Sequence, residues 1–235
     1  MITLERLSKI YTTEAGPVPA LRAIDLAIAS GEFMAIMGQS GSGKSTMMNI
    51  IGLLDRPTSG RYLLEGHDVS GLDADARARL RGRQFGFVFQ SYNLIPRMSA
   101  LEQVELPLVY QGVANRRRRA AEALARVGLA DRMHHRPTQL SGGEQQRVAI
   151  ARSLVVQPRV VLADEPTGAL DTTTGEEVMR LFRALVSEQQ ITVIVVTHEA
   201  QIAAHTDRVV RMLDGRIVED VPTPHAAPAG REALA

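Results

Sequence analysis

The chain has 235 residues, of which 45% are hydrophobic and 23% are charged, and its formal net charge is +1. These values are typical of a soluble globular protein with one large domain, or one domain with a subdomain, and they give no overall attraction to nucleic acid or an anionic membrane. The absence of cysteine excludes disulfides and thiolate metal sites. The longest apolar runs are too short to cross a bilayer and the first residues lack a signal-peptide layout, so we expect a cytosolic protein.

Short strands separated by turn residues dominate the first part of the chain. The segment Thr12–Pro19 contains a glycine and two prolines and is expected to be a loop. Apolar patterns predict strands at 2–10, 21–28, 33–37, 61–64, 67–69 and 85–89, and helices at 47–54 and 73–83.

The composition changes after Gln90, because apolar residues recur at helical spacing from Ser99 to about Val156. We interpret residues 91 to 157, approximately, as a helical insert. The α/β pattern then returns, with strands at 159–162 and 191–196, a helix at 172–188 and a hairpin at 208–218. We expect a domain of residues 1–220, followed at 221–235 by a poorly ordered tail rich in Pro and Ala.

The segment Gly38–Thr46 fits the pattern G-x-x-x-x-G-K-[ST] in full, between a predicted strand and a predicted helix. Its glycines let the backbone wrap around phosphate oxygens, and the helix N-terminus adds partial positive charge. Lys44 is expected to reach the β- and γ-phosphates of a nucleoside triphosphate, and Ser45 to ligate Mg²⁺. The alternative is a glycine-rich turn that starts a helix. The expected phosphate-loop contacts are Gly38, Ser40, Gly41, Gly43, Lys44, Ser45 and Thr46.

Two carboxylates follow the apolar run 160–163. An acidic residue at the end of a parallel strand beside a phosphate loop is suited to hold Mg²⁺, which is the role we expect for Asp164. Glu165 could orient or deprotonate the attacking water. The alternative is a pair of solvated carboxylates at the start of a turn.

A second surface suited to phosphate opens the helix at Leu140–Arg147. Ser141 and Glu144 have the spacing of a capping box, which is a purely structural role. A capping box does not need two glycines between its partners, and Gly142 and Gly143 leave the helix N-terminus bare. The sequence therefore predicts two phosphate-binding surfaces in one chain.

The chain resembles an ATP-binding-cassette (ABC) ATPase subunit from residue 1 to about 220. The resemblance rests on the order of the motifs above together with Gln90, Ala169–Asp171 and His198. The signature Leu140–Arg147 is the specific element, because phosphate-loop proteins at large lack it. The resemblance implies the P-loop NTPase fold of ABC ATPases, an α/β fold with a mostly parallel sheet, an antiparallel β-subdomain and an inserted helical subdomain. It also implies a head-to-tail homodimer, with each ATP between the phosphate loop of one subunit and the signature of the other.

The resemblance assigns roles to single residues. Tyr11 would stack on adenine, with an edge-strand tyrosine as the alternative. Gln90 would contact Mg²⁺ and the attacking water, and His198 the γ-phosphate. The expected catalytic residues are Glu165, His198, Gln90 and Lys44, and the expected Mg²⁺ ligands are Ser45, Gln90 and Asp164.

Three residues are expected to serve the partner subunit. Ser141 and Gly143 would contact the γ-phosphate bound to the other copy. Asp171 resembles an aspartate that acts across the interface, but a helix N-cap would look the same in sequence, and it could do both.

The stretches Ile50–Gly60, Phe85–Leu94 and Leu162–Asp171 resemble the cassettes of the macrolide-export and lipoprotein-release group. Macrolide exporters carry transmembrane segments on the same chain, and this sequence has none, so it resembles stand-alone members that drive a separate permease. The resemblance implies a cytoplasmic protein, peripheral on the inner face of the cell membrane, that serves efflux or lipoprotein or peptide export. It also allows a periplasmic or extracellular adaptor as a further partner.

The apolar residues of Ser91–Ser99 are expected to grip a cytoplasmic element of the permease in a groove near Gln90, although an ordinary packed loop is an alternative. A cassette of a non-transporting membrane complex, in cell division or signalling, stays open as a second function. A cassette acting on nucleic acid or ribosomes is a third class. Near-neutral charge and the lack of tandem cassettes argue against it, so we expect no nucleic-acid partner.

Overall fold

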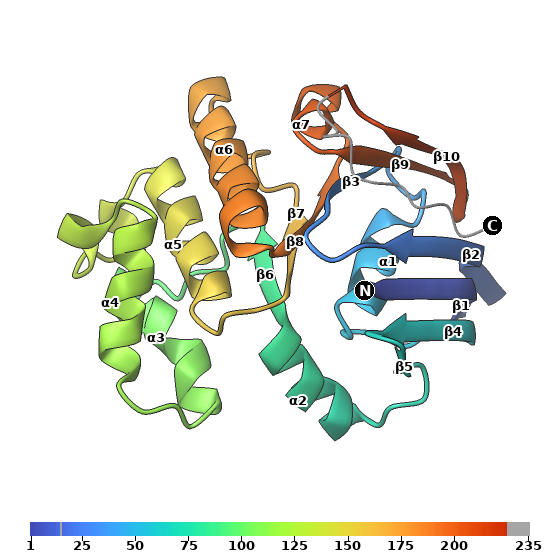
Figure 1. Ribbon diagram of the computed structural model, residues 1–235, viewed down its shortest axis with the longest axis horizontal. Helices are drawn as coiled ribbons and strands as arrows, with labels where there is room; N and C mark the ends of the chain where they lie inside the picture. Colours follow the sequence, from blue (N-terminus) through green and yellow to red (C-terminus); the bar gives the residue numbers. More distant parts are fainter. Residues whose placement is uncertain (15, 225–235) are drawn as a thin grey trace.

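The computed structural model describes residues 1–14 and 16–224 (Figure 1). Within these residues a six-stranded sheet has the order β10-β9-β3-β8-β7-β6. Strand β10 is antiparallel to β9, and the other neighbouring strands are parallel. The predicted mostly parallel sheet is confirmed. The strands are β3 (Phe33–Met37), β6 (Phe85–Phe89), β7 (Val160–Asp164), β8 (Thr192–Thr197), β9 (Arg208–Leu213) and β10 (Arg216–Pro222).

A second, antiparallel sheet has the order β2-β1-β4-β5. It consists of β1 (Ile2–Thr13), β2 (Gly16–Ile28), β4 (Ser59–Leu64) and β5 (His67–Asp68). The prediction of a loop at Thr12–Pro19 is wrong, because β1 and β2 continue into it as a hairpin in which Pro17 pairs with Thr12 and Pro19 with Ile10. The prolines are tolerated because β2 is an edge strand, where a missing N–H leaves no partner unsatisfied.

The helices cover both faces of the six-stranded sheet. They are α1 (Lys44–Ile51), α2 (Ala74–Gln84), α3 (Ala100–Tyr110), α4 (Arg116–Arg126), α5 (Gly142–Leu154), α6 (Thr172–Gln189) and α7 (Ala200–Ala204), with 3₁₀ turns η1 (Ala130–Arg132) and η2 (Pro137–Gln139). Side chains alternate along the buried strands, so Met34 and Ile36 pack with α1 and the antiparallel sheet, while Val193 and Val195 pack with α5 and α6. Helix α1 therefore lies between the two sheets (Figure 1).

Helices α3, α4 and α5 form the helical group at the left of Figure 1, inside the predicted insert. Its apolar residues, such as Leu101, Val104 and Leu124, belong to the same buried cluster as one face of the six-stranded sheet. A buried contact joins α5 to the sheet, because a Cβ on Gly86 of β6 would lie 2.6 Å from the Ser153 carbonyl. The helical group is thus packed directly on the sheet that carries the candidate site.

Some boundaries differ from prediction. Helix α7 and the two 3₁₀ turns are not predicted, because elements of three to five residues are too short to show a period. Strand β10 extends to Pro222, and the Thr223 N–H donates to the Asp207 carbonyl, so the predicted tail begins with ordered residues. The rest of that tail, residues 225–235, lies outside the described residues. Among the described helices, none has the length and apolarity to span a bilayer.

Candidate functional site

The predicted nucleotide-binding segments meet at one edge of the parallel sheet. Strands β3, β8, β7 and β6 are neighbours, and in register Met37 pairs with Thr197 while Asp164 pairs with Phe89. The residues that follow these strand ends are Gly38, His198, Glu165 and Gln90. The carboxyl ends of parallel strands form a crevice where ligands commonly bind. The sheet therefore brings together segments separated by more than a hundred residues.

The phosphate loop has the backbone shape that its glycines predict. Gly38 has a φ of 153°, and a Cβ there would lie 2.4 Å from the Met212 carbonyl, while Gly43 has a φ of 103° and its Cβ would lie 2.6 Å from the Ala20 carbonyl. Larger residues would not fit at either position. In the part of the chain that the structure describes, no side chain caps the N-terminus of α1. Its first N–H groups have no intrahelical acceptor and are free for an anion.

Lys44 starts α1 with its ammonium folded over the loop, donating to the carbonyls of Gly38 at 2.8 Å and Gln39 at 2.9 Å. A phosphate at the helix N-terminus would meet this charge directly. The predicted contacts Ser40, Gly41 and Ser45 are exposed, and Thr46, in the same helix turn as Ser45, is half-buried. All predicted phosphate-loop residues thus lie on one rim of the crevice.

The two carboxylates after β7 have different surroundings. Burial raises the pKa of Asp164, and the charge of Glu165 raises it further, against the opposing charge of Lys44. The Glu165 carboxylate lies 2.8 Å from Nδ1 of His198. That hydrogen bond, and then the Glu165 charge, raise the pKa of His198. The pKa of Asp164 and the pKa of His198 therefore respond to the same two neighbouring charges, Glu165 and Lys44.

Gln90 is exposed at the end of β6, beside the turn after β7. A Cβ on Gly168 would lie 2.7 Å from its Nε2 atom, so the glycine makes room for the amide. The hydroxyl of Ser45, the carboxylate of Asp164 and the amide oxygen of Gln90 are hard oxygen donors of the type that Mg²⁺ prefers. Among the described residues, no group of three or more His, Cys, Asp or Glu side chains is arranged to hold a metal ion.

The signature lies on a different element. Ser141 caps α5 by accepting from the Glu144 N–H at 3.2 Å, and the Glu144 carboxylate accepts from the Ser141 N–H at 2.8 Å, which is the predicted capping box. Gln146 donates to the Pro166 carbonyl at 2.6 Å. Within residues 1–14 and 16–224, no hydrogen bond joins the signature to the phosphate loop. The signature opens α5 in the helical group, whereas the phosphate loop opens α1 between the two sheets, so the two predicted phosphate surfaces lie on different elements (Figure 1).

Asp171 caps α6, which is one of its two predicted roles. Its carboxylate accepts from the Thr174 N–H at 3.0 Å and from the Thr174 hydroxyl at 2.7 Å. Thr174 in turn faces the signature, because a Cβ on Gly143 would lie 2.4 Å from its Cγ2 atom. No sequence pattern points to Thr174, since its importance arises from packing between α5 and α6.

Tyr11 lies near the end of β1, and its hydroxyl donates to Asp55 at 2.8 Å. The Lys9 ammonium lies 4.7 Å from the centre of the Tyr11 ring and 2.7 Å from Asp55. Neither Lys9 nor Asp55 is predicted as a site residue by the sequence. Asp55 belongs to the Ile50–Gly60 stretch, but nothing in the spacing links it to Tyr11.

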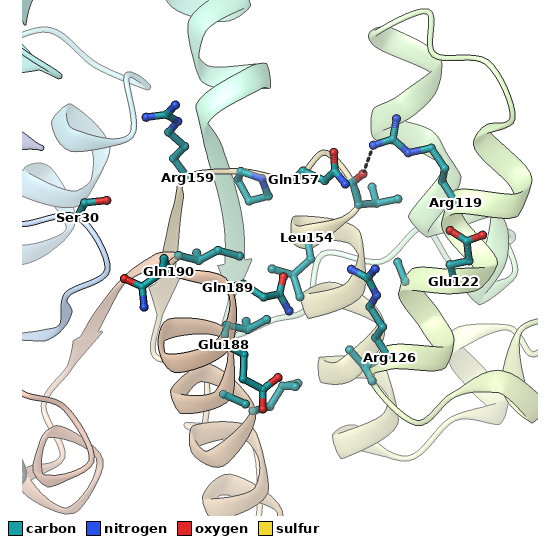
Figure 2. Close-up of a pocket in the computed structure, with 18 residues that line it drawn as sticks. Ser30, Arg119, Glu122, Arg126, Leu154, Gln157, Arg159, Glu188, Gln189 and Gln190 are labelled. Atoms are coloured by element: carbon teal, nitrogen blue, oxygen red, sulfur yellow. Dashed lines mark hydrogen bonds between the residues drawn. The ribbon is translucent and has the colours of Figure 1, made fainter.

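The two largest hollows found among the described residues lie outside this crevice. One, of about 710 Å³, lies between α4 and the ends of α5 and α6 (Figure 2). It is lined by Ser30, Arg159 and Gln190, which precede β3, β7 and β8, so it lies where the strands begin and not where they end. The other is a groove of about 840 Å³ between α2, β6, α3 and α5.

A protein-family model described as ABC transporter matches residues 21–168. The macrolide export ATP-binding/permease protein MacB of Brucella melitensis is 53% identical over 242 residues, covering 100% of this chain but 37% of that protein. The chain thus spans little more than a third of such relatives. The uncharacterized ABC transporter ATP-binding protein YvrO of Bacillus subtilis is 52% identical, with 94% of this chain and 96% of that protein covered.

The chain is also similar to solved structures of ATP-binding cassettes. The dimeric post-hydrolysis state of the ATP-binding cassette MJ0796, bound to ADP and Pi, has a TM-score of 0.87 and 44% identity, covering 94% of this chain and 98% of that one. The cbiO1 protein of Clostridium perfringens, part of the ABC transporter complex cbiONQ, has a TM-score of 0.85 and 32% identity, covering 94% of this chain and 88% of that one.

Proposed function

The chain belongs to the ABC transporter family as one of its ATP-binding ATPase cassettes, and we propose that it works as a head-to-tail homodimer that drives a membrane permease. The predicted family and fold are confirmed by these similarities. The observation that carries the proposal is the separation of the uncapped α1 N-terminus from the signature at α5. Two phosphate surfaces that do not meet in one subunit can complete one site when two copies associate.

In each proposed ATP site, residues of the two subunits have different roles. Lys44 and the N–H groups of α1 bind the β- and γ-phosphates, and Ser141 and Gly143 of a second copy close over the γ-phosphate. Ser45, Asp164 and Gln90 would hold Mg²⁺, which neutralises charge on the phosphates.

Glu165 is the proposed general base, because it follows β7, which only β8 separates from the strand before the phosphate loop, and its carboxylate contacts His198 at the end of β8. Glu165 would take the proton of the attacking water. His198 would contact the γ-phosphate, and with Lys44 it would stabilise the charge of the transferring phosphoryl group. Asp171 would act across the interface while it caps α6.

The permease would dock in the groove between α2, β6, α3 and α5. Its floor is apolar, with Phe87 and Phe89 from β6 and Pro107 from α3, and Tyr110 at its rim is 84% exposed. Within the predicted docking segment Ser91–Ser99, Ile95 is 44% exposed, whereas Leu94 packs on the core. An exposed apolar groove of this kind is suited to an apolar segment of another chain.

The proposed cargo and setting rest on the relatives. Because MacB relatives are named for macrolide export, we propose efflux, or export of lipoprotein or peptide, with the cassette on the inner face of the membrane. YvrO, 96% of which this chain covers, is named as an ABC transporter ATP-binding protein, and we propose for this cassette a permease on a separate chain. A periplasmic or extracellular adaptor would be a further partner.

Mixing two defective subunits tests the composite site. Lys44→Ala damages the phosphate loop and Ser141→Arg the signature, so neither homodimer has a complete site. A heterodimer isolated with two affinity tags has one complete site, and its ATPase rate should return to up to about half the parent rate. The matched control pairs Lys44→Ala with the double variant Lys44→Ala/Ser141→Arg, which leaves no complete site. Heterodimers as inactive as this control would contradict the head-to-tail arrangement.

The permease is tested by recovery of partners. The tagged chain, purified from solubilised membranes, should bring down an integral membrane protein. Recovery of ribosomes or DNA without a membrane protein would overturn the transporter proposal. A membrane partner that supports ATP turnover but moves no macrolide, lipoprotein or peptide would favour a non-transporting complex in cell division or signalling.

A further inference from the structure

The part of β1 that carries Tyr11 has little support from its own sheet. Pairing between β1 and β4 ends at Ser8, opposite Ser59, whereas pairing with β2 continues to Thr13. Beyond Ser8 the hairpin is a two-stranded ribbon, which is marginally stable by itself. Tyr11 therefore needs contacts outside the ribbon to keep a fixed position.

Those contacts converge on the turn that follows α1. The Tyr11 hydroxyl donates to Oδ2 of Asp55 at 2.8 Å, and the Lys9 ammonium donates to Oδ1 at 2.7 Å. The N–H of Arg56 also donates to Oδ1, at 2.7 Å, and Lys9 donates to the Arg56 carbonyl at 2.8 Å. One further bond runs from the Ile10 N–H to the Thr58 hydroxyl at 3.0 Å. Both oxygens of Asp55 are thus engaged, and one of them holds the tyrosine.

Partial burial and charge strengthen the hydrogen bonds between Lys9, Tyr11 and Asp55. The Lys9 side chain is 13% exposed and that of Asp55 is 31% exposed, so their ion pair is partly shielded from water. Partial burial pushes the pKa of Asp55 upward, but hydrogen bonds from Lys9, Arg56 and Tyr11 outweigh it and keep the pKa below its ordinary value. Asp55 is therefore ionised at neutral pH, and charge-assisted bonds of this type are stronger than neutral ones.

The network also affects how much of the Tyr11 ring a ligand can reach. The Lys9 ammonium lies over the Tyr11 ring at 4.7 Å, which occupies one face by a cation–π contact. Tyr11 is nevertheless 36% exposed, so ring surface remains for a flat ligand. Because Asp55 lies in the turn after α1, the same turn fixes the ring relative to the helix that starts at the phosphate loop.

We propose that Asp55, with Lys9, is a positioning residue that holds the Tyr11 ring ready to stack on the adenine of ATP. This inference rests on the stacking role of Tyr11 in the proposed function. A ring fixed before binding loses less conformational entropy when the base arrives, so the network raises affinity for the base and not for the phosphates. Asp55 touches no part of the nucleotide and acts through Tyr11.

The test compares Mg²⁺-ADP with Mg²⁺-pyrophosphate, which lacks the base, by calorimetry on the full chain. Tyr11→Ala should weaken ADP about ten-fold or more, as expected for loss of one stacked base. Asp55→Ala should weaken ADP roughly two- to ten-fold, as expected for loss of one or two hydrogen bonds. Pyrophosphate affinity should stay the same in both variants. In a Tyr11→Ala background, Asp55→Ala should have no further effect.

Two further variants control for folding. Asp68→Ala removes a carboxylate paired with Arg61 in the same antiparallel sheet, and should leave both affinities unchanged. Tyr11→Phe keeps the ring and removes only the hydroxyl, so it should reproduce most of the Asp55→Ala defect. If Asp55→Ala does not fold, Tyr11→Phe decides, and parent-like ADP affinity in it would overturn the inference.

The remaining outcomes separate the inference from the proposed function. Equal losses of ADP and pyrophosphate in Asp55→Ala would overturn the inference, because Asp55 would then act on α1 and the phosphate loop. Normal ADP affinity in Asp55→Ala, with weak binding in Tyr11→Ala, would overturn the inference alone. Normal ADP affinity in Tyr11→Ala would overturn the stacking role itself, and the inference with it.

Discussion

The contact between Gly143 of the signature and Thr174 of α6 gives a quantitative prediction. Gly143 is buried, and a Cβ added to it would lie 2.4 Å from Cγ2 of Thr174. Thr174 cannot rotate away freely, because its hydroxyl donates to Asp171 at 2.7 Å. Gly143→Ala must therefore either push α5 and α6 apart or break the cap of α6.

The expected magnitude follows from these alternatives. Overpacking a well-packed site costs about 1–3 kcal/mol. Breaking the hydroxyl bond instead costs about 0.5–1.5 kcal/mol. Replacing glycine in a helix returns up to about 1 kcal/mol through helix propensity. Because the cheaper alternative sets the cost, we expect Gly143→Ala to lower the free energy of unfolding by up to about 1.5 kcal/mol, measured by urea denaturation.

A second substitution isolates the contact. Thr174→Ser removes the Cγ2 methyl and keeps the hydroxyl that donates to Asp171. In the Gly143→Ala background it should restore most of the lost stability, which gives a coupling of about 1 kcal/mol in the double-mutant cycle. Gly142→Ala is the matched control, because its Cβ would meet the flexible end of Tyr92 at 3.0 Å and should not couple to Thr174.

Two results would contradict a steric conflict between Gly143→Ala and Thr174. Gly143→Ala as stable as the parent would mean that the site accommodates a methyl without strain. An identical effect of Thr174→Ser in both backgrounds would mean that the Cγ2 atom is not the obstacle.

Three further predictions concern the crevice. Glu165→Gln should keep ATP binding, trap a dimer visible by size-exclusion chromatography with ATP, and stop turnover; unchanged hydrolysis would remove Glu165 from its role. Because Glu165 raises the pKa of His198, NMR titration should find a lower His198 pKa in Glu165→Gln than in the parent, and equal pKa values would contradict this. The stabilisation of the folded state by the Glu165–His198 pair should be fully present below about pH 6.5, and it should vanish as the pH rises through the raised pKa of His198. Gly168→Ala should displace the Gln90 amide, lower kcat and change stability by less than about 0.5 kcal/mol, whereas Gly71→Ala, with open space around it, should leave kcat unchanged.

Local patterns in the sequence determine much of the fold. The phosphate loop, the strand 85–89 and the helix after Asp171 are specified by features within a few residues: glycines, apolar runs and a capping side chain. The order of the motifs indicates the family. These signals are strong because backbone conformation and helix capping depend on neighbours in sequence.

Some features of the site follow from such local patterns, and others depend on the whole sheet. The phosphate loop and the residues after β6, β7 and β8 are expected together, because parallel strands end at a common edge. The prolines of the β1–β2 hairpin mislead the prediction, because a proline is compatible with a strand only when that strand lies at an edge, and edge position is a property of the whole sheet.

Only the tertiary structure decided which distant side chains meet. Tyr11 and Asp55 are 44 residues apart, and Gly143 and Thr174 lie on different helices. No periodicity or spacing in the sequence encodes these contacts, because they depend on how the hairpin, the sheets and the helices pack against one another in three dimensions. The sequence alone predicted two segments suited to phosphate, each at the start of its own helix. The support of Tyr11 from the turn after α1 required the packed chain.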